Sequence, residues 1–257
     1  MLVGDLQRRE SAHLEQSLVA LRKHASTLAF RRKVSRSLRI MEAWRARCTA
    51  PSVSCGGGKD SSAVLLLAMR LGIVHETPIY RADPPNPLPD RPDYVRMLVS
   101  AIPGGLWRIV PYPWDVDAVL AGEQPYPALL KIRRLKERYT IDGIDGVALG
   151  LRTEESKGRL WLARTKGPIY KLGHTLMCCP ILEWTAEEVL GFILAEDRLP
   201  LNPVYHKLRM APPLTYLRDG TWYPRETPDA HGHRDWLALH YPEVVQKYDL
   251  AVRLGKG

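Results

Sequence analysis

The sequence is poor in cysteine and phenylalanine, with four and two of its 257 residues respectively. Cys178 and Cys179 are adjacent, which is a poor geometry for a disulfide framework. No pair of cysteines has the C-x2-C spacing that is typical of zinc sites and cubane iron-sulfur clusters. We therefore expect reduced thiols, and neither a structural zinc ion nor an iron-sulfur cluster.

Long apolar runs are also missing. No stretch approaches the roughly 18 continuous apolar residues of a membrane-spanning helix. Residues 1–10 are polar and charged and contain no apolar core of a secretory leader. Because 45% of the residues are hydrophobic and 25% are charged, the composition is that of a globular chain. We expect a cytoplasmic protein without a membrane partner.

Acidic residues are scarce mainly near the start of the chain. Residues 1–47 hold eleven Lys and Arg against four Asp and Glu, so this segment carries +7 of the net charge of +9. Such a segment suggests nucleic acid or another phosphate-bearing partner, although a solvated helix face is its commoner meaning. The candidate phosphate contacts are Arg31, Arg32, Lys33, Arg36 and Arg39.

Proline and glycine are absent from about Ser11 to Arg47, where apolar residues recur at alternating spacings of four and three. This periodicity predicts helix. The repeat is too short for a coiled coil, so we expect packing on the chain's own core or on a second copy in a homodimer. The predicted organisation is a basic helical segment at 1–47, a nucleotide-binding domain at 48–210 and a C-terminal extension at 211–257.

Between these ends, short apolar runs alternate with amphipathic segments. This alternation is typical of a parallel sheet that is covered by helices, and therefore predicts an α/β fold. A polar loop is expected after Arg152. Strands are predicted at 52–54, 77–81, 106–111, 146–151 and near 177–182, and helices at 61–71, 93–101, 128–139, 186–195 and 240–254.

The segment Ser54–Ser62 reads Ser-Cys-Gly-Gly-Gly-Lys-Asp-Ser-Ser and lies between a predicted strand and a predicted helix. Its glycines let backbone N–H groups approach an anion, and the helix dipole adds attraction. Val53 and Asp60 break the Walker A pattern, and Ser61 breaks the dinucleotide-binding pattern. The segment is expected to bind phosphate, and a glycine-rich strand-to-helix turn is the structural alternative.

Residue types within this phosphate loop suggest their roles. Backbone amides from 57 to 61 would cradle a pyrophosphate, Lys59 would neutralise it, and Ser61 or Ser62 would donate a hydroxyl. Asp60 would either bind Mg²⁺ or cap the helix. Lys59 and Asp60 are expected at the loop surface, where alanine substitution abolishes turnover but not folding. The predicted nucleotide contacts are Ser54, Gly56, Gly57, Gly58, Lys59, Ser61, Ser62 and Asp83.

A loop of the form Ser-x-Gly-Gly-x-Lys-Asp-Ser resembles those of the PP-loop ATP pyrophosphatases. Residues 150–159 (Gly-Leu-Arg-Thr-Glu-Glu-Ser-Lys-Gly-Arg) are similar to the G-x-R-x-x-E-S-x-x-R segment of one branch of that superfamily. This branch contains phosphoadenosine phosphosulfate (PAPS) reductases and the small subunit of ATP sulfurylase. The resemblance covers about residues 50–210 and implies a HUP-type, Rossmann-like parallel sheet with helices on both faces and the nucleotide over the strand ends.

The second signature contributes further candidates. Arg152 and Arg159 are expected to contact phosphate or sulfate oxygens, and Glu155 to orient an arginine or a metal-bound water. Asp83 is expected to contact ribose or adenine, although residues 82–87 depart from the family's D-T-G pattern. His231, His233 and His240 are interpreted as solvated rather than metal-binding.

Residues 180–189 and 199–205 are similar to the family's P-I-x-x-W-T and I-P-x-x-P-L-Y elements, and are expected to be architectural. Thr185 is the predicted N-cap of a helix, with Glu188 completing a capping box, and Trp184 is predicted to be in the core. Tyr205 and Lys207 are candidates for the pocket of an acceptor substrate.

The resemblance implies an ATP-binding enzyme that cleaves the α–β phosphate bond, releases pyrophosphate and adenylates or activates an acceptor. Mg²⁺ would be its cofactor, and sulfur metabolism or nucleic-acid modification its setting. Lys59 and Asp60 favour ATP, since the reductase branch usually lacks this pair. No cysteine follows Cys179, whereas reductases of the family use a C-terminal cysteine. The alternatives are a PAPS or APS reductase-like sulfonucleotide-binding protein and a non-catalytic nucleic-acid adaptor that uses residues 1–47.

Overall fold

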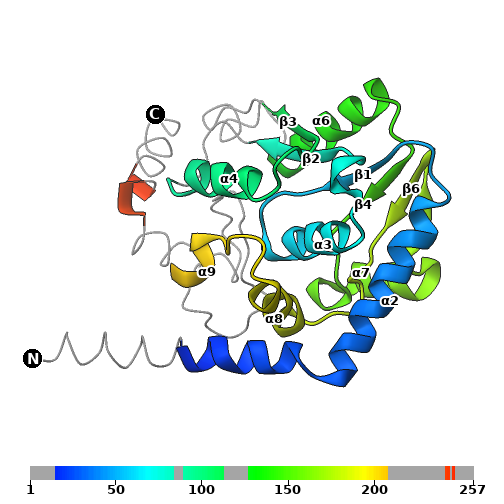
Figure 1. The fold of residues 1–257 in the computed structure, drawn as a ribbon. Coiled ribbons are helices and arrows are strands. Elements are labelled where there is room, and N and C mark those ends of the chain that lie inside the picture. The colour runs from blue at the N-terminus through cyan, green and yellow to red at the C-terminus, as the bar shows by residue number, and fades with distance from the viewer. Residues whose placement is uncertain (1–14, 84–88, 113–126, 208–240, 244, 247–257) are drawn as a thin grey trace, which may run out of the picture.

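The computed structural model describes residues 15–83, 89–112, 127–207, 241–243 and 245–246. Within these residues, helices surround a six-stranded sheet with the strand order β3-β2-β1-β4-β6-β5 (Figure 1). Neighbouring strands run parallel except for the pair β5 and β6. The predicted α/β, Rossmann-like fold class is therefore confirmed.

The elements follow one another as strand and helix along most of the chain. The strands are β1 (Pro51–Ser54), β2 (Ile79–Asp83), β3 (Trp107–Pro111), β4 (Gly146–Ala148), β5 (Ile169–Leu172) and β6 (Thr175–Cys178). The helices are α2 (Leu28–Arg45), α3 (Lys59–Arg70), α4 (Arg91–Ser100), α6 (Pro127–Ile141), α7 (Lys157–Lys166), α8 (Ala186–Glu196) and α9 (Pro203–Lys207), with 3-10 turns η1 (Ile73–His75) and η2 (Thr153–Glu155). Residues 15–25 are also helical.

Side chains of β2 alternate between the two faces of the sheet, as the pleat requires. Ile79 packs in the main core with α3, whereas Tyr80 packs in a second cluster with Leu135 of α6. Helix α3 lies beside α8 (Figure 1) and buries most of its side chains. Most of these side chains are apolar, as is typical of a helix inside the core. Neither α3 nor any other helix in the described part of the chain is long and apolar enough to cross a membrane.

Helix α2 packs on the chain's own core, as the sequence predicts. Trp44 Nε1 donates to the Leu176 carbonyl at 2.9 Å, and Ser37 Oγ donates to the Pro180 carbonyl at 2.7 Å. Thr27 separates α2 from the helical residues 15–25 and caps it by accepting from the N–H of Phe30. The buried residues of α2 are Phe30, Val34, Ser37, Met41 and Trp44. A homodimer stays a prediction.

Three details of the predicted secondary structure are wrong. Strand β4 ends at Ala148, and residues 157–166, expected in a loop, form α7. Helix α7 buries none of its side chains, so it lacks the apolar stripe that reveals a helix in a sequence. Strand β5 was missed; it joins β6 through a two-residue turn at Gly173. Most of the helix predicted at 240–254 lies outside the described residues.

Candidate functional site

The two predicted signatures meet at the carboxyl ends of β1 and β4. The phosphate loop follows β1 and the second signature follows β4, and these strands are neighbours in the sheet. The connections from β1 lead to β2 and β3 on one side, while β4 and β6 lie on the other. Ligands of open α/β sheets bind where the strand order reverses in this way.

Gly150 allows the two signatures to touch. A Cβ at this position would lie 2.5 Å from the carbonyl carbon of Asp60 and 2.7 Å from the backbone nitrogen of Ser61. Both atoms belong to backbone and cannot move aside as a flexible side chain would. The motif contains this glycine, but the reason for it, a close approach to the first turn of α3, becomes visible only in three dimensions.

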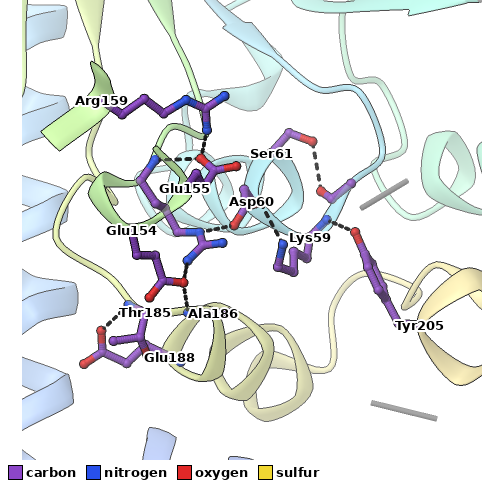
Figure 2. Close-up of polar contacts among 12 residues, drawn as sticks. Lys59, Asp60, Ser61, Glu154, Glu155, Arg159, Thr185, Ala186, Glu188 and Tyr205 are labelled. Carbon is purple, nitrogen blue, oxygen red and sulfur yellow. Dashed lines mark hydrogen bonds and ion pairs between the residues drawn. The ribbon is translucent and has the colours of Figure 1, made fainter. Parts of the chain in front are cut away.

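Asp60 joins the two signatures through ion pairs. Its carboxylate accepts from Lys59 Nζ at 3.1 Å and from Arg152 Nε (Figure 2). Arg152 also binds Glu154, and Glu154 Oε1 accepts from the N–H of Ala186 at 2.9 Å. A continuous polar network therefore runs from the start of α3, through the loop after β4, to the first turn of α8.

Burial corrects one expectation about this network. Lys59 is only 1% exposed and Arg152 is 0% exposed, whereas the side chain of Asp60 keeps 16%. Tyr205 of α9 lies against the same turn, and its hydroxyl accepts from the Lys59 N–H at 2.6 Å. Lys59 is therefore not at the loop surface, because α9 covers it, and its substitution is expected to affect folding as well as binding.

Glu155 occupies one of its two predicted positions. Its Oε2 accepts from the N–H of Arg152 at 3.0 Å, and it forms an ion pair with Arg159. The Glu155 side chain is 7% exposed and that of Arg159 is 31% exposed. Glu155 thus orients an arginine that remains accessible at the strand ends, where its contact with an anion stays a prediction.

The glycine loop makes a turn that needs a glycine at position 57. Gly57 has a φ of 87°, a conformation that favours glycine. Gly58 is the N-cap of α3, with no side chain capping it, so the predicted cap role of Asp60 is wrong: Asp60 lies in the first turn. Ser61 Oγ donates to the Gly58 carbonyl at 2.9 Å. The hydroxyl is therefore used within the loop, and its donation to a phosphate stays a prediction.

The other predicted contacts are less directly placed. Ser62 is 2% exposed, and its Oγ lies 3.5 Å from the hydroxyl of Tyr94. Ser54 is half-buried at the end of β1. Asp83 ends β2 with its side chain 45% exposed and lies 3.6 Å from Arg81. The side chain of Lys207 lies outside the described residues.

Three cations beside the loop were missed in the sequence. Arg81 Nη1 and Arg91 Nη2 donate to the Gly56 carbonyl at 2.9 and 3.3 Å. A Cβ on Gly56 would lie 3.6 Å from Lys131 Nζ. These three cations follow no common spacing in the sequence. The sole signal was an arginine between apolar residues of the second strand. Asn202 was missed too; its Nδ2 donates to the Gly57 carbonyl at 3.2 Å.

Cys55 lies inside the phosphate loop and is fully buried. Burial raises the pKa of its thiol, and hydrogen bonds from the Gly57 backbone and Ser61, with the charges of Arg81 and Lys131, lower that pKa in part. The net direction is upward, so the thiol is neutral at neutral pH. A protonated, enclosed thiol is a weak nucleophile, and Cys55 is therefore interpreted as part of the loop's packing.

Residues 104–222 match the family model described as the phosphoadenosine phosphosulfate reductase domain. The chain is therefore similar to the PAPS reductase family over residues 104–222. The predicted resemblance is thereby confirmed. The match begins beyond the phosphate loop, so the role of residues 54–62 depends on their own sequence and geometry. No curated protein matches the chain.

Two solved structures are similar to this chain. PAPS reductase from Candida auris, in a phosphate complex, has 15% sequence identity and a TM-score of 0.49, over 74% of this chain and 89% of that chain. FMN adenylyltransferase from Candida glabrata, in complex with FAD and inorganic pyrophosphate, has 12% identity and a TM-score of 0.47, over 72% of this chain and 65% of that chain. The chain spans just under two thirds of the adenylyltransferase.

Asp60 is the predicted Mg²⁺ ligand. Proteins often hold Mg²⁺ with one or two carboxylates together with substrate phosphates, so a single carboxylate fits that type of site. Among the described residues no cluster of three or more His, Cys, Asp and Glu could hold a metal ion. Asp60 is also engaged by Lys59 and Arg152. Binding of Mg²⁺ would therefore require phosphate oxygens and a rearranged ion pair. His231, His233 and His240 lie outside the described residues.

The basic face of α2 is partly used in contacts within the chain itself. Lys33 Nζ lies 2.7 Å from Glu188, and Arg36 Nη1 lies 2.5 Å from Glu183. These two cations attach α2 to the start of α8. Nucleic-acid binding by this face stays a prediction. Its remaining candidate contacts are exposed: Arg31, Arg32 and Arg39.

Proposed function

We propose that this chain is an ATP-binding PP-loop enzyme that cleaves the α–β phosphate bond, releases pyrophosphate, and adenylates or otherwise activates an acceptor. The observation that supports it most is the ion-pair network in which Asp60 of the phosphate loop holds both Lys59 and Arg152. Cations from both signatures, the first turn of α3 and a glycine loop thus occupy one place. Such a place suits a chain of phosphates.

Each group has a distinct part in this proposal. Backbone amides at the start of α3 and the ammonium of Lys59 bind the phosphate chain, since an ammonium is a compact point charge. Arg159, held by Glu155, contacts a second anionic group. Fixed charges of this kind stabilise the charge that develops on phosphate oxygens during transfer. Mg²⁺, bound through Asp60 and the phosphates, would neutralise the same oxygens.

The family match favours a second candidate, a sulfonucleotide-binding protein of the PAPS or APS reductase type. A sulfonucleotide would present sulfate or phosphate oxygens to Arg159, whose side chain is 31% exposed, whereas Arg152 is fully buried in its ion pairs. The two candidates differ at the start of α3, because only ATP carries β and γ phosphates for Lys59 to bind. Direct comparison of the two ligands therefore separates them.

The test uses the purified full chain, Mg²⁺ and ATP labelled at the α phosphate, with sulfate, tRNA and DNA as separate acceptors. We expect pyrophosphate together with labelled AMP or a labelled acceptor, and calorimetric titration should show tighter binding of ATP than of PAPS. Lys59→Met should lose ATP binding at a temperature at which circular dichroism shows the variant to be folded, whereas Lys136→Met, at an exposed position on α6, should not. Binding of PAPS without ATP would support the second candidate, and binding of neither would overturn both.

A further inference from the structure

The phosphate loop is flanked by cations on its β2 side as well as on its β4 side. Arg81 lies in β2, Arg91 begins α4 and Lys131 lies in α6. Arg81 is on the same side of the pleat as Ile79 and so faces α3, whereas α6 packs in the cluster on the opposite face. Cations therefore approach the loop from both faces of the sheet.

Gly56 is the point where these cations converge. Two guanidinium groups, those of Arg81 and Arg91, donate to its carbonyl oxygen at 2.9 and 3.3 Å. The Nζ of Lys131 lies at ordinary contact distance, 3.6 Å, from where a side chain on Gly56 would begin. The charges of Arg81 and Lys131 both act on the adjacent Cys55 sulfur. The ammonium of Lys131 therefore lies close to the loop at Gly56.

The three cations differ in what they are able to do. Arg81 is 0% exposed and Arg91 is 7% exposed, and both bind a backbone oxygen. Because a peptide unit is planar and trans, fixing the Gly56 oxygen also fixes the direction of the Gly57 N–H. The two arginines are therefore positioning residues for the loop. Lys131 is half-buried on a helix and carries a point charge on a flexible stem.

We infer that Lys131 is a second lysine of the phosphate site and binds the nucleotide's phosphate chain from the β2 side, while Lys59 acts from the β4 side. This inference rests on the proposed function and specifies its ligand class. The ligand is a nucleotide with two or more linked phosphates, because a chain of phosphates offers each of the two lysines an anionic group of its own. Lys131 then contributes to selection of ATP over AMP.

The experiment compares Lys131→Ala with wild type in the full chain, by calorimetric titration with ATP and with AMP. We expect the affinity for ATP to fall about tenfold or more, as for loss of a charged hydrogen bond, and the affinity for AMP to change little. Lys131→Arg should recover part of the loss, since it restores the charge. Lys136→Ala removes an exposed lysine one turn and a half further along α6 and should bind both nucleotides as wild type does.

The outcomes separate this inference from the proposed function. If wild type binds ATP and Lys131→Ala binds it equally well, the role of Lys131 is overturned and the proposed function stands. Equal losses for ATP and AMP, with a lower melting temperature, would overturn selection by Lys131 and show a structural role. A wild-type chain that binds no ATP would overturn the proposed function, and this inference with it.

Discussion

On its β4 side the phosphate loop is held by ion pairs between side chains, whereas on its β2 side it is held by side chains that bind its own backbone. Asp60 pairs with Lys59 and Arg152 on the first side. On the second side, Arg81 and Arg91 donate to the Gly56 carbonyl. The first arrangement joins separate elements of the fold, and the second sets the shape of a glycine turn.

The difference shows how one loop can be both anchored and shaped. Ion pairs between buried side chains are costly to break singly, because the partner left behind remains buried with its charge. A donor to a backbone carbonyl costs less to remove but alters where the following N–H points. We therefore expect substitutions on the β4 side to lower the stability of the fold, and substitutions on the β2 side to lower nucleotide affinity.

Asp60→Ala should have the largest effect. It removes the carboxylate that binds Lys59 and Arg152, and leaves fully buried Arg152 with Glu154 as its remaining ion-pair partner. We expect the free energy of unfolding to fall by about 3 kcal/mol, measured by urea denaturation with circular dichroism. Asp93→Ala is the matched control, since the side chains of Asp93 and its partner Arg96 are 69% and 73% exposed and such surface pairs contribute about 1 kcal/mol or less. Equal losses in both variants would contradict the anchoring role.

Gly150→Ala tests the contact that brings the two signatures together. Its Cβ would lie 2.5 Å from the Asp60 carbonyl carbon, and overpacking of this kind costs about 1 to 3 kcal/mol. We expect both a loss of about 2 kcal/mol in unfolding free energy and weaker ATP binding. Gly158→Ala is the control, because its nearest neighbour would be Ser156 Oγ at 4.0 Å. Wild-type stability and affinity for Gly150→Ala would show that the loop shifts freely.

The residues on the β4 side of the loop could be predicted from the sequence, because they belong to continuous sequence motifs. Lys59 and Asp60 are consecutive, and Arg152 belongs to a continuous second motif. The capping box at the start of α8 was also predicted in detail. Thr185 Oγ1 accepts from the Glu188 N–H at 3.2 Å, and Glu188 Oε2 accepts from the Thr185 N–H at 2.8 Å. This predicted capping box is confirmed, and so is the burial of Trp184, which is 3% exposed.

The contacts on the β2 side of the loop could not be predicted, because their residues come together only through the order of the strands. Arg81, Arg91 and Lys131 belong to three elements, and a charged residue in a helix such as α6 is ordinarily a solvated one. Helix α7 escaped for a different reason: it buries no side chain, so no periodic pattern marks it. Sequence patterns reveal residues that are contiguous or periodically spaced. The residues that meet where the strand order reverses are neither.

Arg81→Met tests the shaping role at a smaller expected cost. Methionine fills much of the same space but cannot donate to the Gly56 carbonyl, which Arg91 still reaches at 3.3 Å. We expect the free energy of ATP binding, measured by calorimetry, to weaken by about 1.5 kcal/mol. The free energy of unfolding should fall by less than that. Arg108→Met is the control, since Arg108 is exposed on the neighbouring strand β3. A larger effect on stability than on binding would erase the distinction between the two flanks.

Tyr205→Phe should have the smallest effect and sharpens the comparison at the start of α3, where both flanks meet. The change keeps the buried ring and removes the hydroxyl that accepts from the Lys59 N–H at 2.6 Å. Loss of one neutral hydrogen bond lowers the unfolding free energy by about 1 kcal/mol. The same change releases a helix N-terminal N–H for a phosphate, so we expect ATP affinity not to fall.

Urea denaturation and calorimetry on Tyr205→Phe measure these two quantities, and Tyr170→Phe, in the half-buried edge strand β5, is the matched control. A lower affinity with unchanged stability would instead place the Tyr205 hydroxyl on the ligand, as expected for a residue lining the acceptor pocket. Tyr205 would then belong with Lys131 among the groups that contact the substrate. Lower stability with undiminished affinity places it with Asp60, among the groups that hold the loop before the nucleotide arrives.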